Sequence, residues 1–279
     1  MQGAMQCRPP DAGAARHKNK IPRMHYMKKI LQLALLFLAT LGLVRGVAAE
    51  TRLLEMRNVD ARVVRVKLDG VMEVRIRQGN VPSLSITADK RYIADVSTAQ
   101  SGDTLHIETE VRGFKLGPSS IRADLVLPNL RELSSEGFGS TDITGFKGEE
   151  LTLSLEGAGS IKLVGDYRKL NASLGGVGSM QLWIGNNERA ELDLQGAGSV
   201  VLGGRGRLLK ASLGGLGSLN AQQFEVDAVN LELSGLGNAT VNAHTNAKLN
   251  LSGLGSVVVY GKPANRDVSV EGLGKVSWK

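Results

Sequence analysis

The amino-acid sequence predicts an all-β protein, a parallel, right-handed β-helix (β-solenoid) with coils of about 19 residues, preceded by an irregular β portion. Three observations predict it. A Gly-x-Gly unit recurs at a nearly constant step, apolar and polar residues alternate around each unit, and turn-forming residues separate the earlier runs. Such short repeats bury an apolar face by stacking on their neighbours. The right-handed winding is expected from the chirality of parallel crossover connections.

The Gly-x-Gly unit occurs eight times after residue 136, at steps of 18 to 20 residues. Each coil is expected to advance by one inter-strand spacing, about 4.8 Å. Glycine is expected where the narrow coil bends sharply or where one wall approaches the opposite wall, because a side chain does not fit there. The units begin at Gly137, Gly157, Gly176, Gly196, Gly215, Gly235, Gly253 and Gly272.

Apolar residues alternate with polar residues on both sides of each unit. In one repeat, Leu153, Leu155, Ile161 and Leu163 share a phase with the two glycines, and mostly polar residues lie between them. A period of two is typical of a β-strand with one buried face. Each repeat therefore predicts strands that line a common interior.

The portion before the regular array is expected to be an irregular start of the same body. Residues 66–76 fit the repeat with Met72 in place of the second glycine. Residues 84–127 hold further alternating runs, which turn residues such as Gly102 and Asp103 separate. Both features indicate more β-structure, with less regular connections.

The first 49 residues have the order of a secretory signal peptide behind an extension. Lys28 and Lys29 precede an apolar run at 30–44, and small residues from Val47 to Ala49 follow. We predict cleavage after Ala49 and a periplasmic or secreted protein, with an uncleaved membrane anchor as the alternative. The expected parts are an unstructured upstream extension at 1–26, a signal peptide at 27–49 and one β-helical domain at 50–279. We interpret the extension as the result of a start site assigned too early. Within the domain we expect an irregular part at 50–133 and regular repeats at 134–279.

The positive charge of the whole chain lies in this leader. Residues 1–49 hold eight of the 34 basic and one of the 27 acidic residues, so the expected mature chain carries 26 of each. Nucleic-acid binding needs a basic patch or stripe, so no nucleic-acid partner is expected. Cys7, the one cysteine, also lies in the leader, which excludes a disulfide framework in the domain. Basic residues do cluster in sequence at Arg57, Arg62, Arg65, Lys67, Arg75 and Arg77.

The repeats resemble a known family. Gly-Ala-Gly-Ser and Gly-Leu-Gly-Ser units follow a Leu-Asp-Gly-Val-Met-Glu-Val opening at 68–74 and a Leu-Pro-Asn-Leu-Arg-Glu-Leu stretch at 127–133. Over about residues 60–279, this pattern is similar to the putative auto-transporter adhesin head GIN domain family. The resemblance implies a bacterial, exported, β-helical domain without an assigned activity.

No motif of the expected domain predicts a cofactor or a metal site. The Gly-Gly-Val-Gly-Ser run at 175–179 is similar to a calcium-binding β-roll repeat. Those repeats return every nine residues, however, and use an aspartate ligand where this chain has serine. His106 and His244 lie far apart in sequence and are interpreted as surface residues.

Catalytic residues are not predicted either. A serine nucleophile needs a base within hydrogen-bond reach, and no histidine recurs beside the serines that follow the units, so these are expected to form a structural ladder on the outer face. Glu136, Glu156 and Glu271 share a repeat phase, but most are expected to lie too many coils apart to act together. We therefore expect no enzyme. The ladder serines are Ser140, Ser160, Ser179, Ser199, Ser218 and Ser256.

The middle residue of every Gly-x-Gly unit is apolar. If the alternation continues through the unit, this residue points outward, and stacked coils align such residues into a stripe. The alternatives are that the glycines turn it inward or that the N-terminal portion covers it. An exposed apolar stripe usually marks contact with a partner or a second copy. Earlier members are Val71, Phe138, Ala158, Val177 and Ala197, and the strongest part, here called the leucine stripe, is Leu216, Leu236, Leu254 and Leu273.

The sequence favours a non-catalytic, exported envelope protein that acts as a structural or protein-binding β-solenoid. An unidentified envelope protein or a second copy is the expected partner on the leucine stripe, and membrane contact is expected only through an uncleaved leader. A carbohydrate-binding or carbohydrate-active β-helix protein is the alternative, by fold analogy; two Trp, three Tyr and four Phe after Ala49 are few for a sugar platform. A third interpretation, a sensor subunit, requires a retained membrane segment at 30–44.

Overall fold

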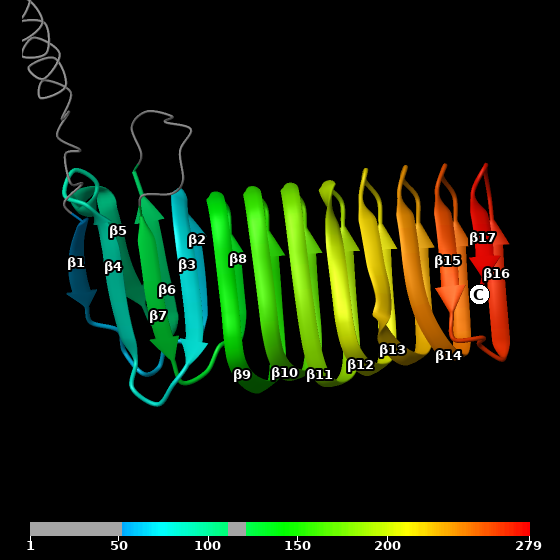
Figure 1. Ribbon diagram of the computed structural model, residues 1–279, viewed down its shortest axis with the longest axis horizontal. Coiled ribbons are helices and arrows are strands. Elements are labelled where there is room, and N and C mark those ends of the chain that lie inside the picture. Colours follow the sequence, from blue (N-terminus) through cyan, green and yellow to red (C-terminus); the bar gives the residue numbers. More distant parts are fainter. Residues whose placement is uncertain (1–51, 111–120) are drawn as a thin grey trace, which may run out of the picture. The chain divides into compact units, whose positions relative to one another are not determined.

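The computed structural model describes residues 52–110 and 121–279. The expected extension, signal peptide and cleavage after Ala49 lie outside the described residues. From β9 onward the coils stack in chain order as a parallel β-solenoid (Figure 1). Its regular part makes about seven turns that are about 20 residues apart, so the predicted fold class is confirmed. The right-handed sense of the winding stays a prediction.

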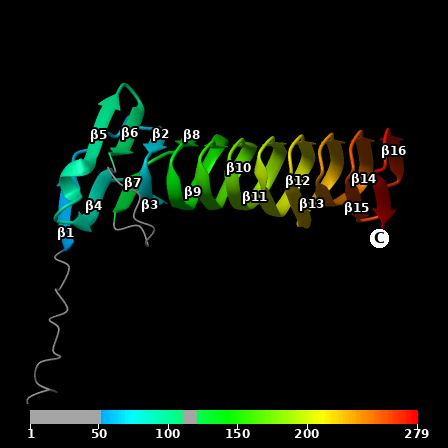
Figure 2. The same cartoon turned by 90° about the horizontal axis from the view of Figure 1, so that it is seen from above.

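Each regular coil is one long strand with two arms. In β10, the arms Ala158–Val164 and Lys169–Leu174 pair in register with β11, and the register shifts between them. The strand bends at this shift, so the first arms build one sheet and the second arms build another, here called the first and second sheets (Figure 2). The long strands are β9 (Phe138–Leu155), β10 (Ala158–Leu174), β11 (Val177–Leu194), β12 (Ala197–Leu213), β13 (Ser218–Leu233) and β14 (Asn238–Leu251).

Two corners separate the arms. The Gly-x-Gly unit lies where one long strand ends and the next begins, and we call this the glycine corner. The bend within each long strand is the other corner. It carries charged side chains from β9 to β13, such as Asp166 and Arg168 in β10, and we call it the charged corner. Between the corners, Ile161, Leu163 and Leu170 are fully buried, whereas the residues that alternate with them face outward. The predicted period-two burial is thus confirmed.

The neighbouring coil requires the glycines of the glycine corner. A Cβ on Gly157, Gly176 or Gly196 would lie well within 3.0 Å of the carbonyl oxygen of the corner glycine one coil earlier, closer than real Cβ atoms approach. The expectation that glycine permits a close backbone approach is therefore confirmed. The glycines lie at a bend, as expected, but the expected approach to the opposite wall was wrong, because the backbone that comes close belongs to the preceding coil.

The degenerate repeat at 66–76 forms a coil directly before the regular array. Strand β2 (Arg65–Asp69) pairs in parallel with β8 (Glu132–Ser135), and β3 (Val71–Gln78) pairs in parallel with the start of β9. Met72 lies opposite Gly139 in this register. Residues 84–127 therefore interrupt the chain between two coils that are adjacent in space.

Strand direction reverses at the N-terminal end of the solenoid. Strands β6 (Thr104–Thr109) and β7 (Arg122–Leu127) add one more parallel strand to each sheet, beside β2 and β3. The remaining strands are antiparallel: β4 (Ser83–Asp89) to β7, β5 (Val96–Ser101) to β6, and β1 (Arg52–Arg57) to β4. The irregular β portion that the sequence predicts is thus present. A short 3-10 helix, η1 (Ile93–Asp95), joins β4 to β5, and no helix of the described residues is long and apolar enough to span a membrane.

Shorter strands build the last coil. Strands β15 (Ser256–Tyr260) and β17 (Lys275–Trp278) continue the first sheet, and β16 (Asn265–Val270) continues the second. These strands contribute fewer fully buried side chains than the earlier coils do, since every residue of β16 is exposed.

Candidate functional site

The leucine stripe is exposed at the glycine corner. The exposed fractions are 63% for Leu216, 55% for Leu236, 56% for Leu254 and 84% for Leu273. The backbone N–H of Leu236 donates to the carbonyl of Gly215 in the preceding coil at 3.2 Å, so these corners stack directly. Consecutive leucines are therefore about one inter-strand spacing, or 4.8 Å, apart. Inward rotation and cover by the N-terminal portion, the two alternatives to exposure, are wrong for these four residues.

Small residues flank the leucine stripe. Gly214, Ser234 and Ser252 take the outward position two residues before a stripe leucine, so the leucine side chains rise above their surroundings. Earlier in the chain Phe138 and Val177 are also exposed at this corner. The result is a narrow apolar ridge on stacked backbone, between small or polar neighbours.

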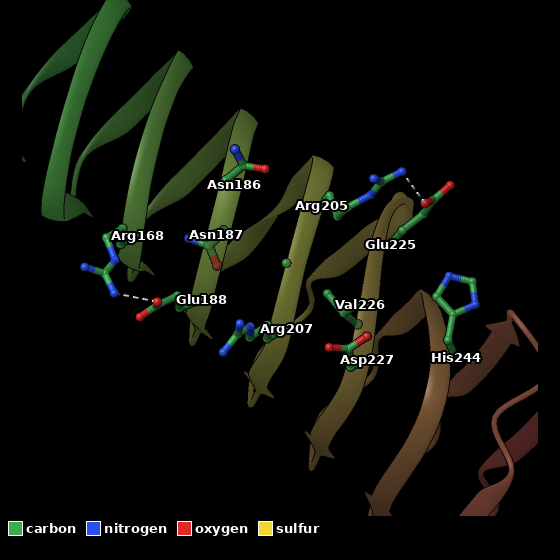
Figure 3. Close-up of a pocket in the computed structure, with 11 residues that line it drawn as sticks. Arg168, Asn186, Asn187, Glu188, Arg205, Arg207, Glu225, Val226, Asp227 and His244 are labelled. Carbon is green, nitrogen blue, oxygen red and sulfur yellow. Dashed lines mark hydrogen bonds and ion pairs between the residues drawn. The ribbon is translucent and has the colours of Figure 1, made fainter.

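A groove of about 570 Å³ lies at the charged corner, on the strands from β10 to β14 (Figure 3). In it, Arg168 Nη2 donates to Glu188 Oε1 at 2.6 Å, and Arg205 Nη2 donates to Glu225 Oε2 at 3.3 Å. The groove is therefore polar and offers both signs of charge. Its other labelled residues are Asn186, Asn187, Arg207, Val226, Asp227 and His244.

Charges of alternating sign follow one another along this corner. Glu149, Arg168, Glu188, Arg207 and Asp227 occupy equivalent positions in five consecutive coils; we call them the charge ladder. Arg168 Nη1 also donates to Glu149 Oε2, at 3.2 Å. The hydrogen bond from Arg168 lowers the pKa of Glu188, and Glu188 in turn raises the pKa of Arg168. Because opposite charges on adjacent strands attract, the ladder favours in-register stacking.

One buried polar atom lies at the floor of the groove. Asn187 is buried, and its Nδ2 donates to the Tyr167 carbonyl at 2.9 Å. Its Oδ1 accepts no hydrogen bond from the described residues. Gly206 occupies the equivalent position in the next coil. This oxygen is itself buried, so a ligand in the groove reaches it only after neighbouring side chains move.

The serines that follow the Gly-x-Gly units form the expected ladder on the outer face. Ser160 pairs with Ser140 and Ser179 in register, and Asn238 takes the place of serine between Ser218 and Ser256. Ser256 Oγ donates to Asn238 Oδ1 at 2.7 Å. The structure places His106 on β6 and His244 at the charged corner, both away from this ladder.

The carboxylates that share a repeat phase are partly brought together. Glu136 and Glu156 lie on consecutive coils, since Ser135 pairs with Leu155, whereas Glu271 lies on the last coil. Glu156 Oε1 accepts a hydrogen bond from Ser154 Oγ at 3.0 Å. Among residues 52–110 and 121–279, no three His, Cys, Asp or Glu side chains gather into a candidate metal site.

Ion pairs engage several residues of the basic cluster near the N-terminal end. Arg62 Nη2 lies 2.8 Å from Asp60 Oδ2, and its hydrogen bond lowers the pKa of Asp60 to about 2. Arg75 pairs with Glu73 at 2.9 Å. These guanidinium groups face carboxylates of their own chain. Further pairs join Arg57 to Glu55, and Arg65 to both Asp103 and Glu132.

Exposed aromatic rings do not form a row. Within the described residues, Phe138 and Trp183 are the exposed large aromatic side chains. Phe138 lies at the glycine corner of β9, whereas Trp183 lies near the charged corner of β11, where its ring covers Gly203 of the next coil. A sugar chain that stacks on successive rings needs rings side by side, whereas these two lie at different corners.

Sequence reasoning missed the charge ladder, although the sequence holds a signal for it. Charged residues recur at positions 149, 168, 188, 207 and 227, at the same steps as the glycines, and their signs alternate. Taken one strand at a time, each of these residues is one more charged side chain on the wet side of the repeat. Only the register between coils shows that they meet.

One family model matches more than half of the chain. The family model described as "Putative auto-transporter adhesin, head GIN domain" matches residues 64–200 and 183–263. No curated protein matches the chain.

Several solved structures share the fold. A putative adhesin from Parabacteroides merdae has a TM-score of 0.74 at 21% identity, over 83% of this chain and 97% of that one. A putative lipid binding protein from Parabacteroides distasonis has a TM-score of 0.71 at 19% identity, over 83% and 98%. A putative adhesin from Bacteroides fragilis has a TM-score of 0.63 at 19% identity, over 83% and 98%. At these identities the likeness shows the fold alone.

Proposed function

Because the chain belongs to the putative auto-transporter adhesin, head GIN domain family, we propose that it is an exported, non-catalytic envelope protein whose β-solenoid binds a partner protein along the leucine stripe. The observation that carries this proposal is the single file of four exposed leucines at the glycine corner. Apolar surface of this kind on an exported protein is typical of an interaction site.

The geometry of the stripe supports binding. The leucines project from stacked backbone, so little conformational entropy of the backbone is lost when a partner binds. Their small neighbours allow close contact. Burying the exposed part of each leucine contributes about 1–2 kcal/mol before the cost of association. Leu216, Leu236 and Leu254 together therefore support a specific but reversible complex. A strand or helix edge that presents apolar side chains at a matching spacing is the partner chemistry that fits.

Two other ligand classes have some support. Lipid is the first of these classes. One protein of the same fold is a putative lipid binding protein, and acyl chains also fit an apolar ridge. The carbohydrate alternative is supported by the polar groove at the charged corner, which presents charged and amide side chains. Each class predicts a different contact surface, so position-specific cross-linking separates them.

The test places a photoreactive amino acid at Leu236 in the full chain, expressed in its native envelope. The control places the same group at Glu232, which is also exposed but lies on the outer face of the second sheet. We expect a discrete protein adduct from position 236 alone, and we expect Leu216→Ser with Leu254→Ser to reduce it. Equal labelling at both positions, or no protein adduct at 236, would contradict the proposal. An adduct with lipid would favour lipid binding, and glycan captured at the groove would favour the carbohydrate alternative.

A further inference from the structure

The C-terminal coil leaves both sheets with an open edge. Strand β16 pairs with β14 and β17 pairs with β15, and nothing in the described part of the chain pairs with their other edges (Figure 1). Val268 and Val270 take the inward positions next to Leu249 and Leu251, which are fully buried. The two valines nevertheless have exposed fractions of 40% and 43%. Open edges with exposed apolar side chains are templates for pairing with another chain.

One contact covers part of this end. Arg266 Cζ lies 4.4 Å from the centroid of the Trp278 ring, and Arg266 Nε donates to the Pro263 carbonyl at 3.1 Å. This cation-π contact reaches from the second sheet to the first across the end of the core. It leaves Val268 and Val270 uncovered.

The N-terminal end is closed in a different way. Arg57 Nη1 donates to the Val96 carbonyl of β5 at 2.8 Å, and Val59, Tyr92 and Ile93 pack against the core there. A copy that stacked head to tail would have to displace these groups. At a C-terminal end, in contrast, the outer edges of β16 and β17 are unpaired in the described residues, so two such ends can pair without displacing any group.

The two open strands carry opposite charges on their outer faces. Asp267 faces outward on β16, and Glu271 follows the strand; Lys275 faces outward on β17, and Lys279 follows it. Opposite charges on adjacent strands stabilise a pair and like charges oppose it. The edge of β16 therefore complements the edge of β17 and not itself.

We propose that two copies of this chain associate tail to tail through their last coils, with β16 of each copy pairing antiparallel with β17 of the other. A twofold axis parallel to the strands produces this arrangement. The interface is the same on both copies, so it closes as a dimer and does not propagate into a fibre. The valines of the two end coils then form one continuous core.

The winding of the solenoid selects this pairing. A coil climbs one inter-strand spacing, about 4.8 Å, per turn. The strand that ends the first sheet therefore lies about half a spacing beyond the strand that ends the second. Pairing β16 with β17 of the other copy gives both sheets the same gap. If β16 paired with the partner's β16, and β17 with the partner's β17, one of the two gaps would close and the other would stay open.

The end coil also fixes the register. Since Arg266 contacts Trp278, these two residues lie level across the coil, and a twofold axis along the strands keeps that level. Val268 then lies beside the partner's Val276. Asp267 lies diagonally between the partner's Lys275 and the partner's Lys279, within reach of both long side chains.

The same axis keeps both glycine corners on one side of the dimer. Leu273, the most exposed leucine of the stripe, then lies beside the partner's Leu273. The two leucine stripes become one line across the dimer. The inference does not rest on the proposed function, because the strand pairing needs no ligand on the stripe.

Charge-reversed variants of the full chain test the proposal by sedimentation velocity. One variant is acidic on both edges, Lys275→Glu with Lys279→Glu, and the other is basic on both, Asp267→Lys with Glu271→Lys. We expect the unmodified chain to sediment with twice the mass of one copy, and each variant alone to dissociate roughly tenfold or more readily. An equimolar mixture should recover the double mass, because every acidic edge then meets a basic one. Recovery on mixing also excludes misfolding as the cause of dissociation.

Other outcomes would overturn the proposal. They are a single-copy mass for the unmodified chain at high concentration, an assembly larger than two copies, or a mixture that stays dissociated. The matched control is Leu216→Ser with Leu236→Ser, which lies away from the end coil and should keep the dimer. Loss of the dimer in this control would assign the interface to the leucine stripe instead.

Discussion

Replacing Gly198 by alanine tests why glycine marks every coil. A Cβ at this position would lie within 3.0 Å of the carbonyl oxygen of Gly178 and 2.9 Å from Leu174 Cδ2. The oxygen belongs to the backbone of the paired strand, so it moves only if the two coils separate locally. Overpacking of this kind costs about 2–3 kcal/mol. Alanine regains about 0.4–1 kcal/mol by restricting the unfolded chain. We expect Gly198→Ala to lower the free energy of unfolding by about 2 kcal/mol.

Gly217 provides a matched control in the same motif one coil later. There the nearest atom to an added Cβ is the Gly198 carbonyl oxygen at 3.4 Å, which is ordinary van der Waals contact, and neither glycine has a positive φ. Gly217→Ala should therefore be neutral or stabilise the protein by up to about 1 kcal/mol.

Urea denaturation followed by far-ultraviolet circular dichroism measures both variants. The two variants can be compared only if the free energy of unfolding falls with urea concentration at the same slope in both. Repeat arrays lose cooperativity when one interface weakens, and the slope then changes. A Gly217→Ala variant as unstable as Gly198→Ala, or a Gly198→Ala variant as stable as the unmodified chain, would refute the close-approach argument.

Three further substitutions probe other contacts. Tyr167→Phe removes the hydroxyl that donates to the buried Leu130 carbonyl at 3.0 Å, so the free energy of unfolding should fall by about 1 kcal/mol; unchanged stability in urea would contradict this. Arg122 lowers the pKa of Glu73 by a hydrogen bond, and a depressed carboxyl pKa adds stability that is present above the ordinary value of 4.5 and is lost as the pH falls below it. Glu73→Gln should therefore flatten the acid side of the stability profile, and identical profiles would argue against the pair. Arg168→Glu puts three carboxylates in a row and should lower the urea midpoint at low salt more than at high salt; a shift that ignores salt would exclude an electrostatic cause.

The repeat pattern in the sequence was enough to predict the coils. Alternation around Leu153 and Leu155 fixed which side chains face the core, and the apolar middle residues fixed which side chains face outward at the glycine corner. Both follow from the period of an extended strand, which is a local property. The same rule placed Leu216 and its equivalents on one exposed line.

Features that depend on contacts between coils were harder to predict. Turn residues such as Gly102 and Asp103 predicted a connection, but not the reversal that makes β5 antiparallel to β6. The step of the glycines did not reveal that the preceding coil, and not the opposite wall, excludes a side chain. The ion pairs of Arg168 with Glu149 and Glu188 can be identified only once the register between coils is known. Strand direction and register are non-local, so a single repeat does not encode them.

The parallel stacking of the glycine corners in one file is the claim on which the leucine stripe depends. Spin labels at Phe138→Cys with a second cysteine at Leu216, Leu236 or Leu254, in a Cys7→Ser background, measure it by pulsed dipolar spectroscopy. Dilution with unlabelled chain removes distances between copies. Four, five and six coils predict backbone separations of about 19, 24 and 29 Å, a constant increment of one inter-strand spacing. Separations that fail to rise with coil number, or that alternate between short and long as in an antiparallel meander, would contradict the account.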